Sequence, residues 1–514
     1  MANAKKPGKK KAVKKKAAKK KATTNKAAKA RGAGNRKAKK KKSASKSVRK
    51  KAAVPAGIAG ELERHRKYFR TAARDIQRGK AVHGSMAWNR MSDLLEGLTA
   101  AQRKDYEAPR RPDDASGLRT IKGSYFTVYY TTSGPNAVTT TIAQRVSDTL
   151  DRVVPLFVSH FGRPFGWGSS GKVYFDATSA MYTSSKTKTI HLNADIFRSN
   201  DSNPPARDGF TTHEAFHAYQ FGCGWSVSVT SSGTEQLTYW ILEGTAVWAE
   251  LEFSQVDGSS ALTNPLTLTS WLEKPNNIRL ANRTRPAQGY VTLPFWMWLA
   301  KTYPAAFKSF ISTTPSTSTF IVDQLAKQVS KEEGSTVGME GVVTTFGANL
   351  VINTWLDRSY LPIYDIEQST RTVIDVPKFD PPSDSLHTQE LSQQDSTWVS
   401  SGNSLPNASI GFFLAKYRLP KRHDPSINQA IFEVTDQSML GGGFPSYFVV
   451  IEYPSTASIE LIEVDSTTKF PEKRAFNDPP HANVYLIVSS DQHPSVSAFA
   501  DDVDLDFEAR FGPP

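Results

Sequence analysis

The stretch TTHEAFHAYQ, residues 211–220, decides how this sequence is interpreted. It contains the pattern H-E-x-x-H, with His213 and His217 four residues apart and Glu214 directly after the first histidine. On an α-helix, residues four apart lie on one face about one turn apart, so both imidazoles can reach a single metal ion. Neutral imidazole is a preferred ligand of Zn²⁺. The pattern therefore predicts a helix from about residue 210 to 221, after a break at Pro204, Pro205 and Gly209, that carries two zinc ligands.

Glu214 has a different task from the two histidines, because it is rotated by about 100° from His213 around the helix. Its carboxylate can face a water molecule held by the metal without binding the metal itself. A zinc ion lowers the pKa of such a water, and a carboxylate can take the proton as the water attacks a carbonyl. The alternative is a core helix whose histidines only pack or form hydrogen bonds, but burying these three side chains without a metal would be costly.

A catalytic zinc ion takes three protein ligands and keeps a fourth position open. The stretch YWILEGTAVWAE, residues 239–250, has apolar residues at helical spacing and predicts a second helix that could bring Glu243 to the two imidazoles. Glu235 is the rival third ligand, but its setting SSGTEQ indicates a turn and a helix start, where glutamate has a capping role. We favour Glu243 over Glu235.

These motifs carry a family resemblance. H-E-x-x-H followed by a helix reading W-x-L-E-G-x-A-x-x-x-E resembles the gluzincin metallopeptidases, which include thermolysin-like and aminopeptidase-type enzymes, and most of all the peptidase MA-like domains of bacteria. The resemblance implies that His213, His217 and Glu243 bind Zn²⁺, that Glu214 is the general base, and that the substrate is a peptide or protein.

The sequence departs from the family in two places. Between His217 and Glu243 there are 25 residues, a longer gap than is usual in thermolysin-like relatives. Val247 stands where those relatives have an aspartate that orients a zinc ligand, so the orienting carboxylate is unassigned. Glu250 is the other acid of this helix, and we interpret it as part of a structural ion pair rather than as the orienting group.

The resemblance also implies a tyrosine that donates a hydrogen bond to the oxyanion formed during hydrolysis. Tyr290, at the start of an apolar helical stretch in residues 285–304, is the residue that fits this role. The other interpretation is that its ring packs on the core at a helix start.

The segments upstream predict the fold. Residues 123–133, 171–177 and 188–196 have the pattern of strands, and residues 136–162 have apolar residues at helical spacing and end at a glycine. We predict an α+β fold whose zincin-like catalytic domain, residues 116–375, combines a mixed sheet with the two active-site helices. The backbone of residues 190–193 is expected to line the substrate groove by main-chain pairing.

The flanking parts have other patterns. Residues 53–115 are charged and helical in pattern, so we predict a helical lead-in. After a linker near residues 376–386, residues 386–514 contain short strand-like runs separated by Gly, Pro, Asn and Asp, which predicts an all-β sandwich. The lone Cys223 excludes an internal disulfide framework. There is no stretch of eighteen apolar residues, so no membrane span is expected.

Residues 1–52 differ from the rest of the chain in their charge. They hold 24 of the chain's 65 Lys and Arg and no acid, so the remainder, with all 49 acids, carries a net charge of −8. Such a segment is predicted to be disordered, because it cannot bury enough apolar surface to offset the entropy of ordering. It resembles the tails of linker histones and of lysine-rich nucleoid proteins. Nucleic acid is therefore the leading partner. An anionic membrane surface, another polyanion or a solubilising role are the alternatives.

Together these observations predict a zinc-dependent peptidase that hydrolyses peptide bonds with Glu214 as general base. The alternative is a nucleic-acid-associated binding protein that uses a zincin-like fold as an inactive scaffold. The tail lacks the apolar region of a secretory signal. The expected location is therefore cytoplasmic or nucleoid-associated.

Overall fold

The computed structural model describes residues 54–77, 84–103, 117–177, 180–200, 204–226, 239–254, 278–281, 292–315 and 321–350, together with strands between residues 388 and 512. The basic segment 1–52, the rival ligand Glu235 and the predicted oxyanion donor Tyr290 lie outside the described residues.

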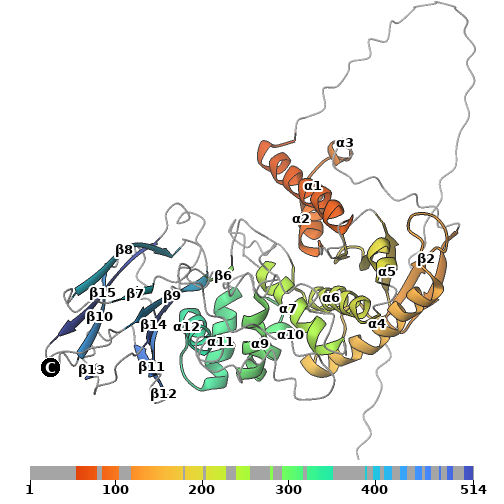
Figure 1. Cartoon of the computed structure of the whole chain (residues 1–514). Coiled ribbons are helices and arrows are strands. Elements are labelled where there is room, and N and C mark those ends of the chain that lie inside the picture. The colour runs from red at the N-terminus through yellow and green to blue at the C-terminus, as the bar shows by residue number, and fades with distance from the viewer. Residues whose placement is uncertain are drawn as a thin grey trace, which may run out of the picture. The chain divides into compact units, whose positions relative to one another are not determined.

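The described residues form an α+β fold with a mixed sheet, which confirms the predicted fold class (Figure 1). The sheet is built from β1 (Arg119–Lys122), β2 (Phe126–Tyr130), β3 (Gly171–Asp176), β4 (Tyr182–Ser184) and β5 (Thr189–Asn193). Its strand order is β1-β2-β3-β5-β4, in which β2, β3 and β5 run parallel and β1 and β4 pair antiparallel at the two edges.

This order corrects the predicted substrate groove. Residues 190–193 lie in β5, which pairs with β3 on one side. On the other side Ile190 and His191 pair with β4, so the main-chain groups of these two residues are used inside the sheet. The edge strand on this side is β4. It gave no signal in the sequence because it is three residues long and lies in a polar stretch, too short for an alternating pattern to be recognised.

Helix α4 (Thr140–Phe161) packs against β2 and against the helix that carries the H-E-x-x-H motif. Thr139 begins it, because its side chain accepts a hydrogen bond from the Ile142 N–H at 3.2 Å. Gly162 ends it in the left-handed conformation, with a φ of 68°, as the terminal glycine of the predicted helix required.

The motif helix α6 extends over Pro204–Gly222, six residues further toward the N-terminus than the prediction. The sequence suggested a break at Pro204, Pro205 and Gly209. However, proline is tolerated in the first helical turn, where a backbone N–H has no acceptor within the helix. A short helix, α5 (Ala194–Ser199), connects β5 to this region.

Helix α7 (Tyr239–Phe253) packs on α6, and α9 (Leu293–Thr302) packs on α7. The other described helices are α1 (Ala56–Gln77), α2 (Ser85–Glu96), α3 (Ala100–Arg103), α10 (Pro304–Ser312), α11 (Ile321–Glu333) and α12 (Met339–Leu350). One hydrophobic core joins the sheet to helices α4, α6, α7 and α9 to α12, with large aromatic side chains such as Phe157, Phe216, Trp296 and Phe307 fully buried in it.

The C-terminal part contributes two further sheets. Their strands are β7 (Thr388–Glu390), β8 (Thr397–Leu405), β9 (Ile410–Arg418), β10 (Gln429–Asp436), β11 (Ser446–Tyr453), β12 (Ser458–Val464), β13 (Arg474–Ala475), β14 (Asn483–Ser489) and β15 (Val503–Gly512). One sheet has the order β13-β10-β15-β8, and the other β12-β11-β14-β9-β6 with β7 also on β9. Strand β6 (Ile278–Ala281), which precedes α9 in the chain, pairs antiparallel with β9.

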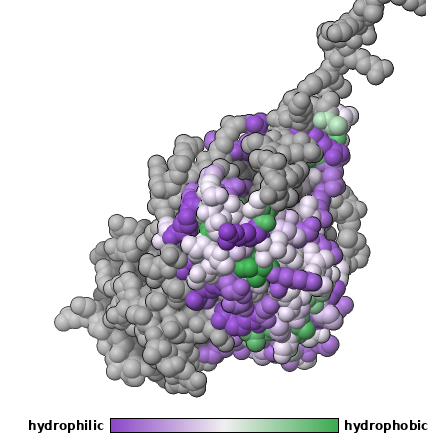
Figure 2. Space-filling model, turned by 90° about the vertical axis from the view of Figure 1, so that its right-hand side faces the viewer, coloured by the Kyte–Doolittle hydropathy of each residue, from purple (hydrophilic) through white to green (hydrophobic). Residues whose placement is uncertain are grey.

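One face of the described part is mostly polar. Figure 2 shows a largely hydrophilic face with small, separate hydrophobic patches. Among the residues up to 350 whose side-chain burial the structure describes, Leu118 is the one large hydrophobic side chain that is exposed, at 36 %. The helices of the described part include none with the length and apolar character that crossing a bilayer requires.

Candidate metal centre

Helix α6 places the two histidines of the motif side by side. The ring centroids of His213 and His217 are 4.8 Å apart, and both side chains are fully buried. Phe216 and Tyr219 pack on the aromatic core around Phe157 of α4. The core therefore fixes the rotation of α6, and with it the direction in which the two imidazoles point.

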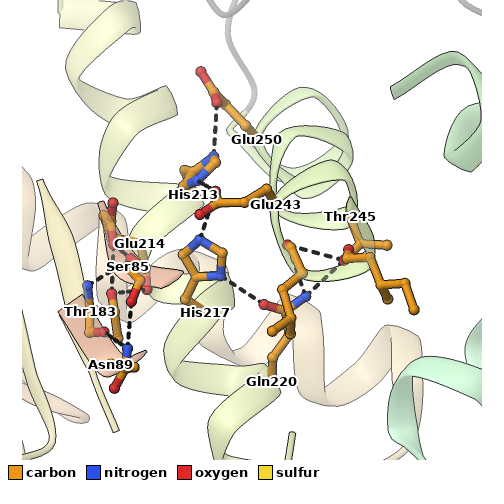
Figure 3. A network of polar contacts seen from close by, with 12 residues as sticks. Ser85, Asn89, Thr183, His213, Glu214, His217, Gln220, Glu243, Thr245 and Glu250 are labelled. Atoms are coloured by element: carbon orange, nitrogen blue, oxygen red, sulfur yellow. Dashed lines mark hydrogen bonds and ion pairs between the residues drawn. The ribbon is translucent and has the colours of Figure 1, made fainter. Parts of the chain in front are cut away.

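Helix α7 brings a carboxylate to both imidazoles (Figure 3). One oxygen of Glu243, Oε2, lies 3.3 Å from Nε2 of His213 and 3.3 Å from Nε2 of His217. The donor atoms of these three residues all lie within 4.8 Å of one another. The structure thus brings together the three residues that the sequence predicted as ligands.

Gly244 explains how α7 reaches this position. A Cβ atom at residue 244 would lie 2.1 Å from Oγ1 of Thr292 and 2.3 Å from Nε1 of Trp296. Any side chain at this position would therefore push α7 away from α9 and its neighbouring residues. The glycine that follows Glu243 in the sequence is needed for this close approach, and the approach sets the place of the Glu243 carboxylate.

The outer nitrogen of each imidazole is held by a second polar group. Nδ1 of His213 lies 3.4 Å from Oε2 of Glu250, and Nδ1 of His217 lies 2.8 Å from Oε1 of Gln220. The amide nitrogen of Gln220 donates to the Leu242 carbonyl and to Oγ1 of Thr245, so its oxygen is left to accept from His217. Such partners orient histidine ligands and select the tautomer.

Glu250 is a candidate for the orienting carboxylate, which was unassigned because Val247 stands at the position expected for it. The sequence offered no aspartate at the expected position and suggested a structural ion pair for Glu250. In the structure Glu250 does form an ion-pair contact, but its partner is the ligand-pattern residue His213. A carboxylate seven residues after Glu243, two helical turns along α7, therefore contacts the outer nitrogen of His213.

The donor set fits a divalent metal ion. Nδ1 of His217 donates to Gln220 and Nδ1 of His213 faces Glu250, so the Nε2 atoms of both rings face the Glu243 carboxylate. Three acceptors facing each other in a buried place repel one another unless a cation lies between them. Two imidazole nitrogens and one carboxylate oxygen are also the ligand types of catalytic zinc sites.

The pKa shifts of His213 and Glu243 also indicate that this cluster favours a positive charge. Burial lowers the pKa of His213, but hydrogen bonds to Glu243 and Glu250 outweigh it and raise this pKa to about 10. Burial raises the pKa of Glu243, but the charge of His217 and hydrogen bonds to both histidines bring it far below its usual range. The surroundings of His213 therefore favour a positive charge beside the Glu243 carboxylate.

Glu214 follows His213 in α6, and its carboxylate contacts α2 and the edge strand β4 (Figure 3). Its carboxylate is fully buried, and its Oε2 accepts hydrogen bonds from Oγ of Ser85 at 2.8 Å and from Oγ1 of Thr183 at 2.7 Å. Ser85 begins α2 and Thr183 is the central residue of β4. A carboxylate held by hydroxyl groups can accept and return a proton while its position stays fixed.

Three residues of this site, Ser85, Thr183 and Gln220, were not predicted from the sequence. Gln220 follows His217 by three residues on the same helix, and this spacing could have indicated the contact. No local pattern pointed to Ser85 or Thr183. His191 of β5 stacks between Tyr174 and Tyr182. It is not part of the group formed by His213, His217 and Glu243.

Comparison of the chain with models of known protein families gives no match, and no curated protein is significantly similar to it in sequence.

Proposed function

We propose that this protein is a zinc-dependent peptidase of gluzincin type. The observation that carries the proposal is the convergence of two imidazole nitrogens and one carboxylate oxygen within 4.8 Å, with Glu214 next to the first imidazole in the chain. His213, His217 and Glu243 would hold the ion, and Glu250 and Gln220 would orient the two histidines. The zincin-like character of residues 116–375 and the sandwich of residues 386–514 are part of this proposal.

The chemistry follows from the residues present. A bound zinc ion supplies Lewis-acid polarisation of the peptide carbonyl and lowers the pKa of a water molecule. Glu214 removes a proton from the attacking water and returns it to the nitrogen of the leaving amine. The hydroxyl group of Thr183 on β4 holds the carboxylate of Glu214 in one orientation during both transfers. Tyr290 remains the predicted donor to the oxyanion.

The test combines metal analysis with a single isosteric substitution. The purified full chain is expected to contain one zinc ion and to hydrolyse members of a peptide library, and a chelator should stop this hydrolysis. Glu214→Gln should keep the zinc and lose at least about 100-fold in kcat, because a positioned general base contributes about 10²- to 10⁴-fold. Glu252→Gln is the matched control, since Glu252 is exposed on α7 and should be silent.

Two results would contradict the proposal. If the chain takes up no zinc, the cluster is a set of hydrogen-bonded core residues. If it holds zinc but hydrolyses nothing, or hydrolyses equally well with Gln at position 214, the inactive-scaffold alternative is favoured instead.

The basic segment supports a second role. Residues 1–52, with 24 basic residues and no acid, would bind nucleic acid through its phosphates, and we propose a cytoplasmic or nucleoid-associated location on this basis. Binding to DNA should weaken steeply as salt is raised, because counterions are released on binding. Removal of residues 1–52 should abolish it. Equal binding by the full and the shortened chain would refute this role.

A further inference from the structure

The outer edge of β4 is a place where an extended peptide could pair. Because β4 pairs with β5 on one side only, main-chain groups of alternate residues point away from the sheet. An edge strand of this kind is a template for another extended chain, which binds by adding a strand. Thr183 is the central residue of this edge, and its side chain contacts Glu214.

Both main-chain groups of Thr183 are already paired, and the partners come from α2. Its N–H donates to Oγ of Ser85 at 2.8 Å, and its carbonyl accepts from Nδ2 of Asn89 at 2.6 Å (Figure 3). Ser85 and Asn89 are one helical turn apart, so one face of α2 supplies both bonds.

The same pattern continues on both sides of Thr183. The Met181 carbonyl accepts from the N–H of Gly84 at 2.6 Å, and the Ser185 N–H donates to Oδ1 of Asn89 at 3.0 Å. Residues 181, 183 and 185 are the alternate positions whose main-chain groups point away from β5. The start of α2 therefore takes the main-chain positions that a paired peptide would use.

Ser85 links this edge to the chemistry. Its hydroxyl group accepts from Thr183 N–H and donates to Oε2 of Glu214 at 2.8 Å. Ser85, Asn89 and Glu214 are all less than 4 % exposed. The helix therefore seals the side of Glu214 that faces the sheet edge.

Further contacts attach α2 to this side of the sheet. The ring of Trp88 stacks on Tyr182 of β4 with a centroid distance of 4.3 Å. Nζ of Lys186, just after β4, lies 2.7 Å from Asp93 and 2.8 Å from Glu96 at the far end of α2. The helix is thus docked along its whole length.

We propose that α2 is a built-in blocking segment, and that an extended polypeptide substrate pairs with β4 only after α2 has been displaced. This inference rests on the peptidase function proposed above. The blocking helix and the edge belong to one chain, so the helix competes at a high effective concentration and the closed form dominates. The closed form would keep hydrolysis slow in the unchanged chain, and displacement or removal of α2 would make it faster.

The decisive variant is Asn89→Leu, which removes the contacts of α2 with Thr183 carbonyl and Ser185 N–H and leaves the proposed catalytic residues unchanged. Amide hydrogen exchange at Thr183 and Ser185 should become faster in the zinc-loaded protein. Its kcat/KM for peptide hydrolysis should rise about tenfold or more, as expected for the loss of two or more buried hydrogen bonds. Arg90→Leu is the matched control, because the neighbouring Arg90 pairs with Glu61 of α1 at 2.7 Å.

If Asn89→Leu does not fold, a series of charge-reversal variants tests whether α2 blocks the edge of β4. Lys186→Glu places a third acid beside Asp93 and Glu96 and should raise both amide exchange and kcat/KM. Adding Asp93→Lys and Glu96→Lys to it should restore the pairs with reversed charges and bring both quantities back. General damage to the fold would not be repaired in this way.

The outcomes separate the two proposals. Zinc-dependent, Glu214-dependent hydrolysis that does not increase when exchange at β4 increases would overturn the blocking role and leave the peptidase intact. Full activity of the unchanged chain, equal to that of Asn89→Leu, would do the same. No zinc and no hydrolysis in any variant would overturn the peptidase proposal, and the blocking role with it.

Discussion

The two sides of the candidate metal centre are built differently. On the helical side, α6 and α7 contribute two histidines and two glutamates whose charged or potentially charged groups contact each other directly. On the sheet-edge side, α2 and β4 surround the Glu214 carboxylate with neutral hydroxyl groups. The first side has the electrostatic character of a place for a cation, whereas the second holds one carboxylate in position.

The difference assigns separate tasks to the two sides. Direct contacts between imidazole and carboxylate in a buried place are strong only when a positive charge completes them. Hydroxyl groups around a carboxylate, by contrast, need no added charge. We therefore expect changes on the helical side to alter metal binding first, and changes on the edge side to alter reactivity while the metal stays bound.

The largest effect on metal binding is expected from Glu243→Gln. The substitution keeps the size of the side chain but replaces a charged ligand with a neutral amide, so tightly bound zinc should be lost from dialysed protein, as measured by elemental analysis. Thr183→Val on the edge side should keep its zinc. Glu235→Gln tests the rival ligand, and loss of zinc from this variant but not from Glu243→Gln would show that the assignment of the third ligand is wrong.

An intermediate effect is expected from the groups that orient the histidines. Glu250→Gln and Gln220→Leu should each weaken zinc binding about 10- to 100-fold, the usual range for such partners, in a competition titration with a chelator. Glu252→Gln, on the exposed face of the same helix, provides the baseline. If both variants bind zinc with unchanged affinity, the contacts of Glu250 and Gln220 with the Nδ1 atoms do not affect metal binding.

The smallest effect concerns the packing behind the helical side. His160 of α4 contacts the rings of Trp248 and Phe253 on α7, and burial, with a smaller effect of Lys308, lowers its pKa from 6.5 to about 4. The folded protein therefore favours neutral His160, so stability should fall as pH decreases from about 6.5 toward 4. His160→Phe should reduce this slope in denaturant titrations at several pH values, and an unchanged slope would show that other groups cause it.

The same division explains what the sequence could predict. The helical side follows from spacing within one or two segments, as in His213 with His217, or Glu243 with Gly244, because helical geometry converts short intervals into shared faces. The edge side joins Glu214 to Ser85, 129 residues earlier, and to Thr183, 31 residues earlier. No local pattern encodes contacts of that kind.

Two errors had local causes. The prolines before the motif were interpreted as a break, although the first helical turn tolerates them, so α6 begins earlier than predicted. The groove was assigned to β5 because β4, only three residues long, was not recognised. The strand order of a mixed sheet depends on long-range pairing, which single-segment patterns do not contain.

Glu243 contacts histidines that belong to a different helix, and this has a consequence for the stability of the whole chain. An ion shared by α6 and α7 would act as a crosslink that exists only in the folded state. Each tenfold rise in free zinc above the dissociation constant would then add about 1.4 kcal/mol to the free energy of unfolding. Resistance to heat would follow zinc supply, and starvation for the metal would leave the chain easier to unfold and degrade.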